Sequence, residues 1–282
     1  MVQVSLSNLF KIDYKGVVFF MNLLITNDDG YEALGINVLA KELAKNHTVY
    51  VLAPSTNRSA VSHCLSVHNS LEVKKVADNV WTCSGFPADC VSIALQSSLF
   101  KDVKFDCVIS GINKGPNLGT DIIFSGTCAA ARQACMYRIP GIALSVDSNS
   151  NNFLDDSTFN YKLLAEFVSK NLEQILEIAK KTDFKSFVNI NAPSVEKYNG
   201  VKYCSSLCIR DYNDSIEITE KEKDSYTTKF IFEMGKTLCN CECPSEVDYN
   251  ANEEGCVSIS TVVVEPICSS NPEIVDCNSF SL

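Results

Sequence analysis

The sequence predicts an α/β fold with a mostly parallel sheet. Short apolar runs of strand length alternate with amphipathic segments of helix length from Met21 to Pro193. The clearest unit is residues 21–53, where the runs MNLLIT and HTVYVLA flank a helical pattern from Ala33 to Lys45. Strand, helix and strand within about thirty residues are typical of a right-handed βαβ unit. We therefore expect helices to cover a parallel sheet.

The same alternation continues after this unit. It predicts a hairpin at 67–76 and 80–83, helices at 87–100, from about 125 and at about 157–180, and strands at 105–110, 142–146 and 187–191. Beyond about residue 200, strand-like runs follow one another without helices between them. We expect residues 21–282 to form one domain, with a core at about 21–200 and a smaller, largely antiparallel β-rich portion at about 201–282.

Residues 1–20 precede this domain as an N-terminal extension to which the sequence assigns no function. They lack the early positive charges and the small-residue cleavage site of a signal peptide. No segment approaches the roughly 18 apolar residues of a membrane span. The 14 cysteines are scattered through a chain of 282 residues. We therefore expect reduced thiols and a cytoplasmic protein without a membrane partner.

The charge of the chain narrows the range of ligands. A formal net charge of −10 and a pI near 4.8 argue against binding to duplex nucleic acid, which needs a basic surface. A small phosphorylated ligand is compatible with this charge if a metal ion supplies local positive charge.

Two adjacent carboxylates, Asp28 and Asp29, directly follow the first buried strand. Ligands of open α/β sheets gather outside the carboxyl ends of the strands. Two neighbouring carboxylates repel each other, and a divalent cation with oxygen ligands stabilises them. This stretch predicts a Mg²⁺ or Mn²⁺ site, and the alternative is a turn whose Asp and Gly only shape the chain.

Loops after two other strands carry more polar groups. The loop 54–66 offers Ser55, Asn57, Arg58 and Ser59, and the loop 111–127 offers Asn113 and Asn117. Oxygen atoms of Asp28, Asp29, Ser59 and Asn113 make a ligand set that suits Mg²⁺ or Mn²⁺. Ser125, Gly126 and Thr127 begin a helix and predict either a phosphate cradle or a simple helix cap.

These groups predict phosphoester hydrolysis assisted by the cation, with either aspartate as acceptor of the proton of the attacking water. No phosphate-binding GxxxxGK[ST] loop and no GxGxxG turn is present. An alternative metal site is zinc held by Cys239, Cys241 and Cys243 with Cys204 and Cys208. The spacing of these cysteines fits no common zinc signature.

Five segments together resemble the SurE family of survival proteins, which are metal-dependent 5′/3′-nucleotidases. These segments are MNLLITNDDG, APSTNRSAVSHCLS, SGFPADCV, DCVISGINKGPNLGTDIIFSGT and FVNINAP. The resemblance implies a Rossmann-like α/β/α core and a homodimer or homotetramer with exchanged C-terminal strands. It also implies one Mg²⁺ or Mn²⁺ ion per subunit, bound by Asp28, Asp29, Ser59 and Asn113.

The same resemblance assigns the other site residues. It makes Asp28, Asp29 and Asn113 catalytic, and makes Ser125, Gly126 and Thr127 the phosphate-binding loop, with Phe124 in place of the more usual tyrosine. Asn57, Arg58 and Asn117 would surround the ligands. The expected substrates are nucleoside 5′- and 3′-monophosphates. The alternatives are a broader phosphatase or exopolyphosphatase and a nucleotide sensor without turnover.

Overall fold

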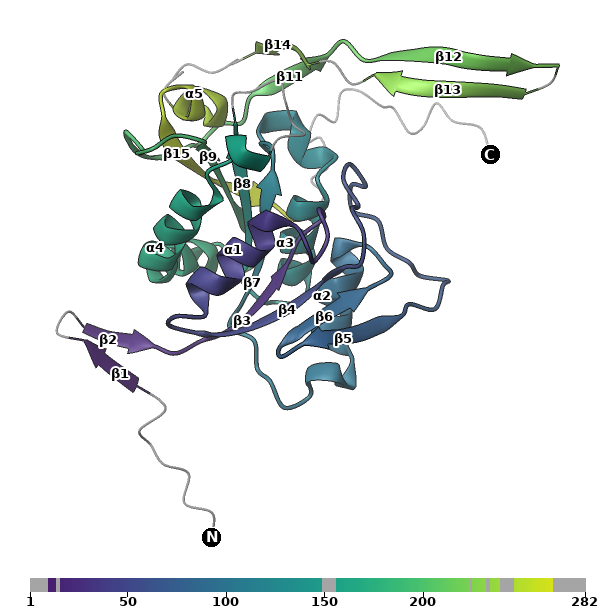
Figure 1. Cartoon of the computed structure of the whole chain (residues 1–282). Helices are drawn as coiled ribbons and strands as arrows, with labels where there is room; N and C mark the ends of the chain where they lie inside the picture. The colour runs from purple at the N-terminus through teal and green to yellow at the C-terminus, as the bar shows by residue number, and fades with distance from the viewer. Residues whose placement is uncertain are drawn as a thin grey trace, which may run out of the picture.

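The computed structural model describes residues 10–13, 16–148, 156–223, 225–231, 234–238 and 246–265. Its centre is a nine-stranded sheet in the order β10-β15-β9-β8-β7-β3-β4-β6-β5, with helices packed on both faces (Figure 1). The six strands from β9 to β6 in this order run parallel to one another. The predicted α/β fold with a mostly parallel sheet is confirmed.

The strands and helices have the following bounds. The strands of the main sheet are β3 Asn22–Thr26, β4 Thr48–Pro54, β5 Val73–Ala77, β6 Val80–Cys83, β7 Cys107–Lys114, β8 Gly141–Asp147, β9 Ser186–Pro193, β10 Gly200–Tyr203 and β15 Cys256–Val263. The α-helices are α1 Leu34–Leu43, α2 Pro87–Gln96, α3 Gly126–Met136, α4 Tyr161–Lys181 and α5 Asp248–Glu253. Three two-stranded pairs join β1 Phe10–Asp13 with β2 Gly16–Phe19, β11 Ile209–Tyr212 with β14 Met234–Leu238, and β12 Ser215–Glu222 with β13 Ser225–Ile231.

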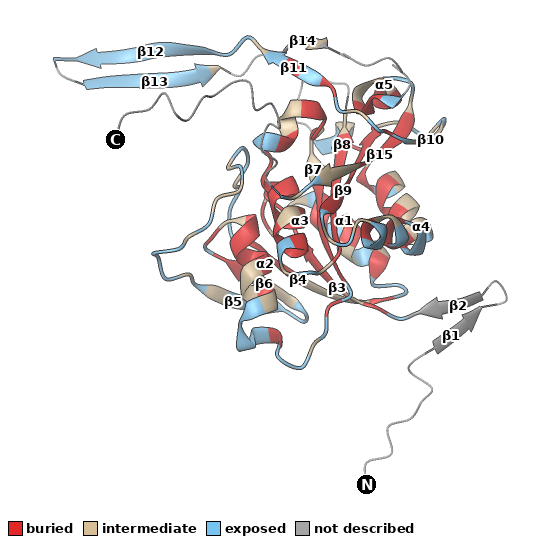
Figure 2. Cartoon of the chain, turned by 180° about the vertical axis from the view of Figure 1, so that it is seen from behind, coloured by how far each residue is buried: buried red, intermediate tan, exposed pale blue. Residues whose placement is uncertain are grey.

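The core lies in two layers between the sheet and its helices, as the buried residues in Figure 2 show. Alternate side chains of a strand point to opposite faces of a sheet. Leu23 and Ile25 of β3 accordingly pack with α1 and α4, whereas Leu24 packs with α2 and α3. The three-layer α/β/α arrangement follows from this alternation in a strand that is apolar on both faces.

The chain beyond residue 200 contributes to two structures. β15 pairs antiparallel with β9 and β10 pairs parallel with β15, so both extend the main sheet. The β12–β13 hairpin instead extends away from the body of the molecule, and all eight residues of β12 are exposed (Figure 1). The short helix α5, which precedes β15, was not predicted, because its six residues carry too little periodicity to be recognised.

Three predicted boundaries were wrong. The first arm of the hairpin expected at 67–76 is a strand only at β5, Val73–Ala77. The strand expected at 105–110 continues as β7 to Lys114, because Asn113 and Lys114 pair with Ser145 and Val146 of β8 beyond an irregularity in the register. Gly111 suggested a loop at this point, but the neighbouring strand keeps the chain extended. The helix expected at 87–100 ends at Gln96, and a separate 3₁₀ turn follows.

None of the helices in the described ranges is both long and apolar enough to span a membrane.

We predict that Leu24→Ala lowers the free energy of unfolding by about 2–5 kcal/mol, because Leu24 is fully buried in a central strand. Leu34→Ala is the matched control, since the Leu34 side chain is 48% exposed on α1. This control should change stability by no more than about 0.5 kcal/mol. Urea unfolding followed by circular dichroism measures both. Equal losses for the two variants would contradict the assigned core.

Candidate active site

The carboxyl ends of β3 and β7 lie next to each other and carry the predicted carboxylates and amide. β3 pairs in parallel with β7 up to Thr26 and Ser110. Asp28 and Asp29 follow the end of β3, and Asn113 lies near the end of β7. The start of α3 reaches the same edge, because Thr127 contacts Asp28. Register in the sheet therefore brings together groups that are up to 99 residues apart in the chain.

Asp28 is buried, with 3% of its surface exposed, and is held by α3. The Thr127 hydroxyl donates to Asp28 Oδ1 at 2.6 Å, and the Thr127 backbone N–H donates to Oδ2 at 3.2 Å. Burial raises the pKa of Asp28, while these hydrogen bonds act in the opposite direction. The N-terminus of α3 thus partly stabilises the ionised form of Asp28, which burial disfavours.

Gly126 allows this close approach of α3 to Asp28. A Cβ atom at Gly126 would lie 2.9 Å from Asp28 Cβ and 3.0 Å from Asp28 Oδ2. Real Cβ atoms essentially never come closer than 3.0 Å, so a larger residue would push the helix away from the carboxylate. Glycine at this position is a requirement of the site's geometry.

Asp29 faces β7. The Lys114 backbone N–H donates to Asp29 Oδ2 at 3.1 Å. Burial, and then the charge of Asp28, raises the pKa of Asp29 to about 7. The Lys114 ammonium group forms an ion pair with Asp156, which begins the 3₁₀ turn before α4.

The Asn113 side chain lies beside Thr127, the residue that contacts Asp28. Its Nδ2 donates to the Gly115 carbonyl at 2.9 Å, and its Oδ1 lies 3.5 Å from the Thr127 hydroxyl oxygen. The Thr127 hydroxyl, which lies 2.6 Å from Asp28, is therefore next to both predicted ligands. Asn113 thus adds an uncharged oxygen atom to the surroundings of Asp28.

This arrangement suits a hard divalent cation. Two adjacent carboxylates repel each other. Burial and then the charge of Asp28 raise the pKa of Asp29, whereas burial raises the pKa of Asp28. A cation bound between them would relieve the repulsion, and carboxylate and amide oxygens are the ligands that Mg²⁺ and Mn²⁺ prefer. The donor set therefore fits the predicted metal.

The loop 54–66 approaches the carboxylates through its backbone. The Arg58 N–H donates to the Asp28 carbonyl at 2.6 Å. Ser59 is exposed, and its N–H donates to Asn57 Oδ1 at 2.8 Å. The Arg58 side chain donates to the Ser84 carbonyl at 2.9 Å, and its guanidinium carbon lies 5.2 Å from the centre of the Phe86 ring. Ser59 thus directly follows the residue whose N–H binds the Asp28 carbonyl, whereas the Arg58 side chain extends toward α2.

The remaining predicted residues have structural partners. The Ser125 hydroxyl accepts a hydrogen bond from the Cys128 N–H at 3.0 Å and so caps α3. Asn117 is buried, and its Nδ2 donates to the Ser145 hydroxyl at 2.8 Å. The predicted helix cap is therefore present, and the Gly126 and Thr127 N–H groups at the same helix end face Asp28.

Sequence reasoning missed two asparagines that hold the loop after β7. Asn191 Oδ1 accepts from the Asn117 N–H at 2.7 Å, and the Asn189 and Asn191 amides donate to the Asn117 carbonyl at 2.9 and 3.1 Å. Both asparagines are fully buried in β9. Two amides in an otherwise apolar buried strand are the signal that could have identified this network.

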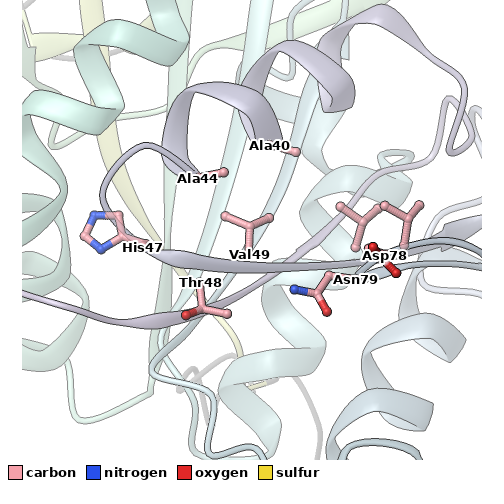
Figure 3. A pocket seen from close by; sticks show the side chains of 9 residues that line it. Ala40, Ala44, His47, Thr48, Val49, Asp78 and Asn79 are labelled. Carbon is pink, nitrogen blue, oxygen red and sulfur yellow. The ribbon is translucent and has the colours of Figure 1, made fainter. Parts of the chain in front are cut away.

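A second hollow lies at the opposite end of the sheet. It has a volume of about 380 Å³ and is lined by the end of α1, the start of β4 and the turn between β5 and β6 (Figure 3). His47 and Asp78 are among its lining residues. It lies at the amino ends of the strands, so it is separate from the carboxylate site.

The zinc alternative is only partly within the described residues. Cys204 and Cys208 are buried free thiols, while Cys239, Cys241 and Cys243 lie outside the described residues. In the described ranges, no three His, Cys, Asp or Glu side chains are grouped closely enough to hold a metal ion. A metal site at Asp28 and Asp29 is compatible with this finding, because its other candidate ligands are an amide and a hydroxyl group.

A family model described as "Survival protein SurE" matches residues 23–214. The chain belongs to the SurE family. A Clostridium botulinum protein named 5′-nucleotidase SurE is 42% identical over 192 residues, which are 65% of this chain and 72% of the relative. A Kosmotoga olearia protein with the same name is 36% identical over 248 residues, 86% of this chain and 92% of the relative.

The SurE fold also extends over most of the chain. The crystal structure of the SurE protein from Aquifex aeolicus superposes with a TM-score of 0.70 and 28% sequence identity, covering 87% of this chain and 94% of that one. The predicted membership of the SurE family is confirmed. The matched region includes all the predicted site residues.

We predict that without metal the wild-type protein loses thermal stability as the pH rises. The folded state binds the Asp29 proton more tightly than the unfolded chain, so unfolding releases a proton. This stabilisation is fully present below the ordinary pKa of 3.8 and is lost as the pH rises through about 7. Melting curves in EDTA between about pH 5.5 and 8.5 test the slope.

Asp29→Asn should flatten this slope, because the variant has no carboxyl group to titrate. Asp78→Asn serves as the control, since the Asp78 side chain is fully exposed and its loss should leave the slope unchanged. Parallel slopes for the wild type and Asp29→Asn would contradict the raised pKa.

Proposed function

We propose that this protein is a metal-dependent phosphomonoesterase that hydrolyses nucleoside 5′- and 3′-monophosphates to nucleoside and inorganic phosphate. The observation that carries the proposal is the pair of adjacent carboxylates at the end of β3. Asp28 is buried against the N-terminus of α3, and Asp29 is half-buried against β7. The name 5′-nucleotidase, carried by relatives up to 42% identical, supports the substrate class.

One Mg²⁺ or Mn²⁺ ion per subunit would bind to Asp28, Asp29 and Asn113, with Ser59 as a further ligand. When bound, such an ion supplies positive charge for the phosphate oxygens and lowers the pKa of a bound water. The raised pKa of Asp29 supports this assignment, because after burial its next cause is the charge of Asp28, which a cation would offset.

Groups of the protein would orient the Asp28 carboxylate, accept a proton and bind the phosphate. Thr127 fixes the Asp28 carboxylate through two hydrogen bonds and so sets its orientation. One of the two aspartates would accept the proton of the attacking water. Ser125, Gly126 and Thr127, at the positive end of the α3 dipole, would lie beside the phosphate oxygens.

We also propose a homodimer or homotetramer in which the C-terminal strands contribute to the contact. Ile216 and Phe230 are cross-strand partners in the β12–β13 hairpin, and both side chains are about 60% or more exposed (66% and 59%). Exposed apolar side chains on a projecting hairpin mark a surface for another protein chain. The described cysteines are free thiols, which supports a reducing, cytoplasmic location.

We predict that Asp28→Asn and Asp29→Asn each lower phosphate release from AMP by more than about 100-fold, since even partners of metal ligands cost 10–100-fold. Release from AMP, GMP and a 3′-nucleotide is measured with EDTA and then with added Mg²⁺ or Mn²⁺. Asp78→Asn is the control and should keep wild-type activity. Nucleotide binding without release of phosphate would indicate a sensor, and equal turnover of unrelated phosphate esters would indicate a general phosphatase.

We predict that the double variant Ile216→Glu/Phe230→Glu has a lower mass in solution than the wild type, because charges on the hairpin disfavour its burial. Light scattering after size exclusion measures the mass. Val67→Glu is the control, because Val67 is 79% exposed on a loop outside the hairpin. An unchanged mass for the double variant would show that the hairpin does not hold the subunits together.

A further inference from the structure

Phe124 exposes an aromatic ring directly before the phosphate loop. Its side chain is 49% exposed, and the adjacent Ile123 is 62% exposed. An aromatic side chain contributes most to binding free energy when its ring is buried in the contact. A half-exposed ring beside a reaction site is therefore a candidate binding surface. Sequence analysis assigned Phe124 no function of its own.

The backbone of Phe124 is fixed from two sides. Its N–H donates to the Asp121 carbonyl at 3.0 Å, and its carbonyl accepts from the Ser62 N–H at 2.8 Å. The Ser62 hydroxyl also donates to the Ile123 carbonyl at 2.7 Å. The loops 54–66 and 111–127 are therefore joined at the residue that carries the exposed ring.

The ring itself is supported by Tyr212 of β11. The two rings meet edge to face, with centroids 5.6 Å apart and planes at 90°. The Tyr212 hydroxyl donates to Asp121 Oδ1 at 2.7 Å and lies 3.1 Å from the Thr120 hydroxyl. Arg210 binds the same Asp121 at 3.2 Å. Tyr212 packs against Phe124 and is itself fixed by hydrogen bonds. The Phe124 ring therefore loses little conformational freedom when a ligand binds to it.

The position of Phe124 relates it to the reacting phosphate. Phe124 is three positions before Thr127 in the chain, so their Cα atoms are at most about 11 Å apart. Thr127 contacts Asp28, and Val61 lies close to Gly126 from the other loop. The phosphate end of a substrate would bind polar groups of this segment, while apolar side chains flank the same segment.

We propose that the exposed face of Phe124 stacks on the base of a nucleoside monophosphate whose phosphate binds at residues 125–127, with Tyr212 as the positioning residue that holds the ring. This inference rests on the proposed function. A base is the part of that substrate with an extended π face, and a fixed aromatic ring is a base-tolerant stacking surface. A phosphate ester without a ring gains nothing from Phe124.

The test compares AMP with glycerol 2-phosphate, a phosphomonoester without an aromatic group, on the full chain with Mg²⁺ or Mn²⁺. Phe124→Ala and Phe124→Leu should lower kcat/KM for AMP about tenfold, mainly by raising KM, because stacking on a base is lost. Both variants should leave glycerol 2-phosphate within about twofold of the wild type. Phe124→Tyr keeps the ring and should restore AMP hydrolysis.

Two further variants separate stacking from support. Tyr212→Phe keeps the ring contact but removes its hydroxyl, so it should raise KM for AMP less than Phe124→Ala. Phe20→Ala is the matched aromatic control, because Phe20 is 46% exposed just before β3, outside the site and the hairpin. It should leave the ratio of kcat/KM for the two substrates unchanged.

Each other outcome overturns the inference in a distinct way. An equal loss for both substrates would mean that Phe124 only supports the loop. No change for either would mean that the base lies elsewhere, and a changed mass of Phe124→Ala in solution would make the ring a subunit contact. A wild-type protein that hydrolyses neither substrate would overturn the proposed function itself.

Discussion

The placement of a buried carboxylate, Asp28, next to the half-buried Asp29 at the end of β3 is the constraint on which the rest of the site depends. Asp28 is almost inaccessible, and desolvation raises the pKa of both Asp28 and Asp29. A paired, hydrogen-bonded environment is what makes buried charge tolerable. Thr127 and the backbone of Lys114 provide the hydrogen bonds, and Gly126 provides the space for them. The missing element is positive charge, which a divalent cation would bring.

The C-terminal portion supports this site from outside the parallel strands. Asp248 of α5 is fully buried and accepts hydrogen bonds from the N–H groups of Gly119 and Cys208, which joins the loop after β7 to the chain before β11. The contacts of Tyr212 and Arg210 with Asp121 fasten the same loop farther along. The loop that leads into α3 is therefore held by residues beyond 200, a part of the chain that contains none of the predicted metal ligands.

The fold was predictable from the sequence where the residue pattern within a single strand was sufficient. Leu23, Leu24 and Ile25 are apolar on both faces, and this pattern alone indicates a central strand with helices on each side. The continuation of β7 through Asn113 could not be predicted, because it depends on pairing with β8 rather than on local preference. The fold was thus predictable from periodicity, and its boundaries were not.

The site was predictable to a similar extent. Adjacent aspartates after a strand could be recognised as a candidate, but the Lys114 N–H that binds Asp29 is a backbone group without a sequence signal. Likewise Tyr212 is 88 residues from Phe124 in the chain (212 − 124), and only the tertiary structure brings their rings together. Local motifs therefore identify ligands, while their supports are determined by tertiary packing.

The central claim is that one divalent cation binds between Asp28, Asp29 and Asn113. Anomalous diffraction from crystals grown with Mn²⁺ tests it most directly, because the signal locates the ion independently of activity. We expect one strong peak per subunit, about 2.0–2.6 Å from carboxylate oxygens of both aspartates. A peak at Cys204 and Cys208 instead, or no peak near Asp28 at saturating Mn²⁺, would contradict the claim.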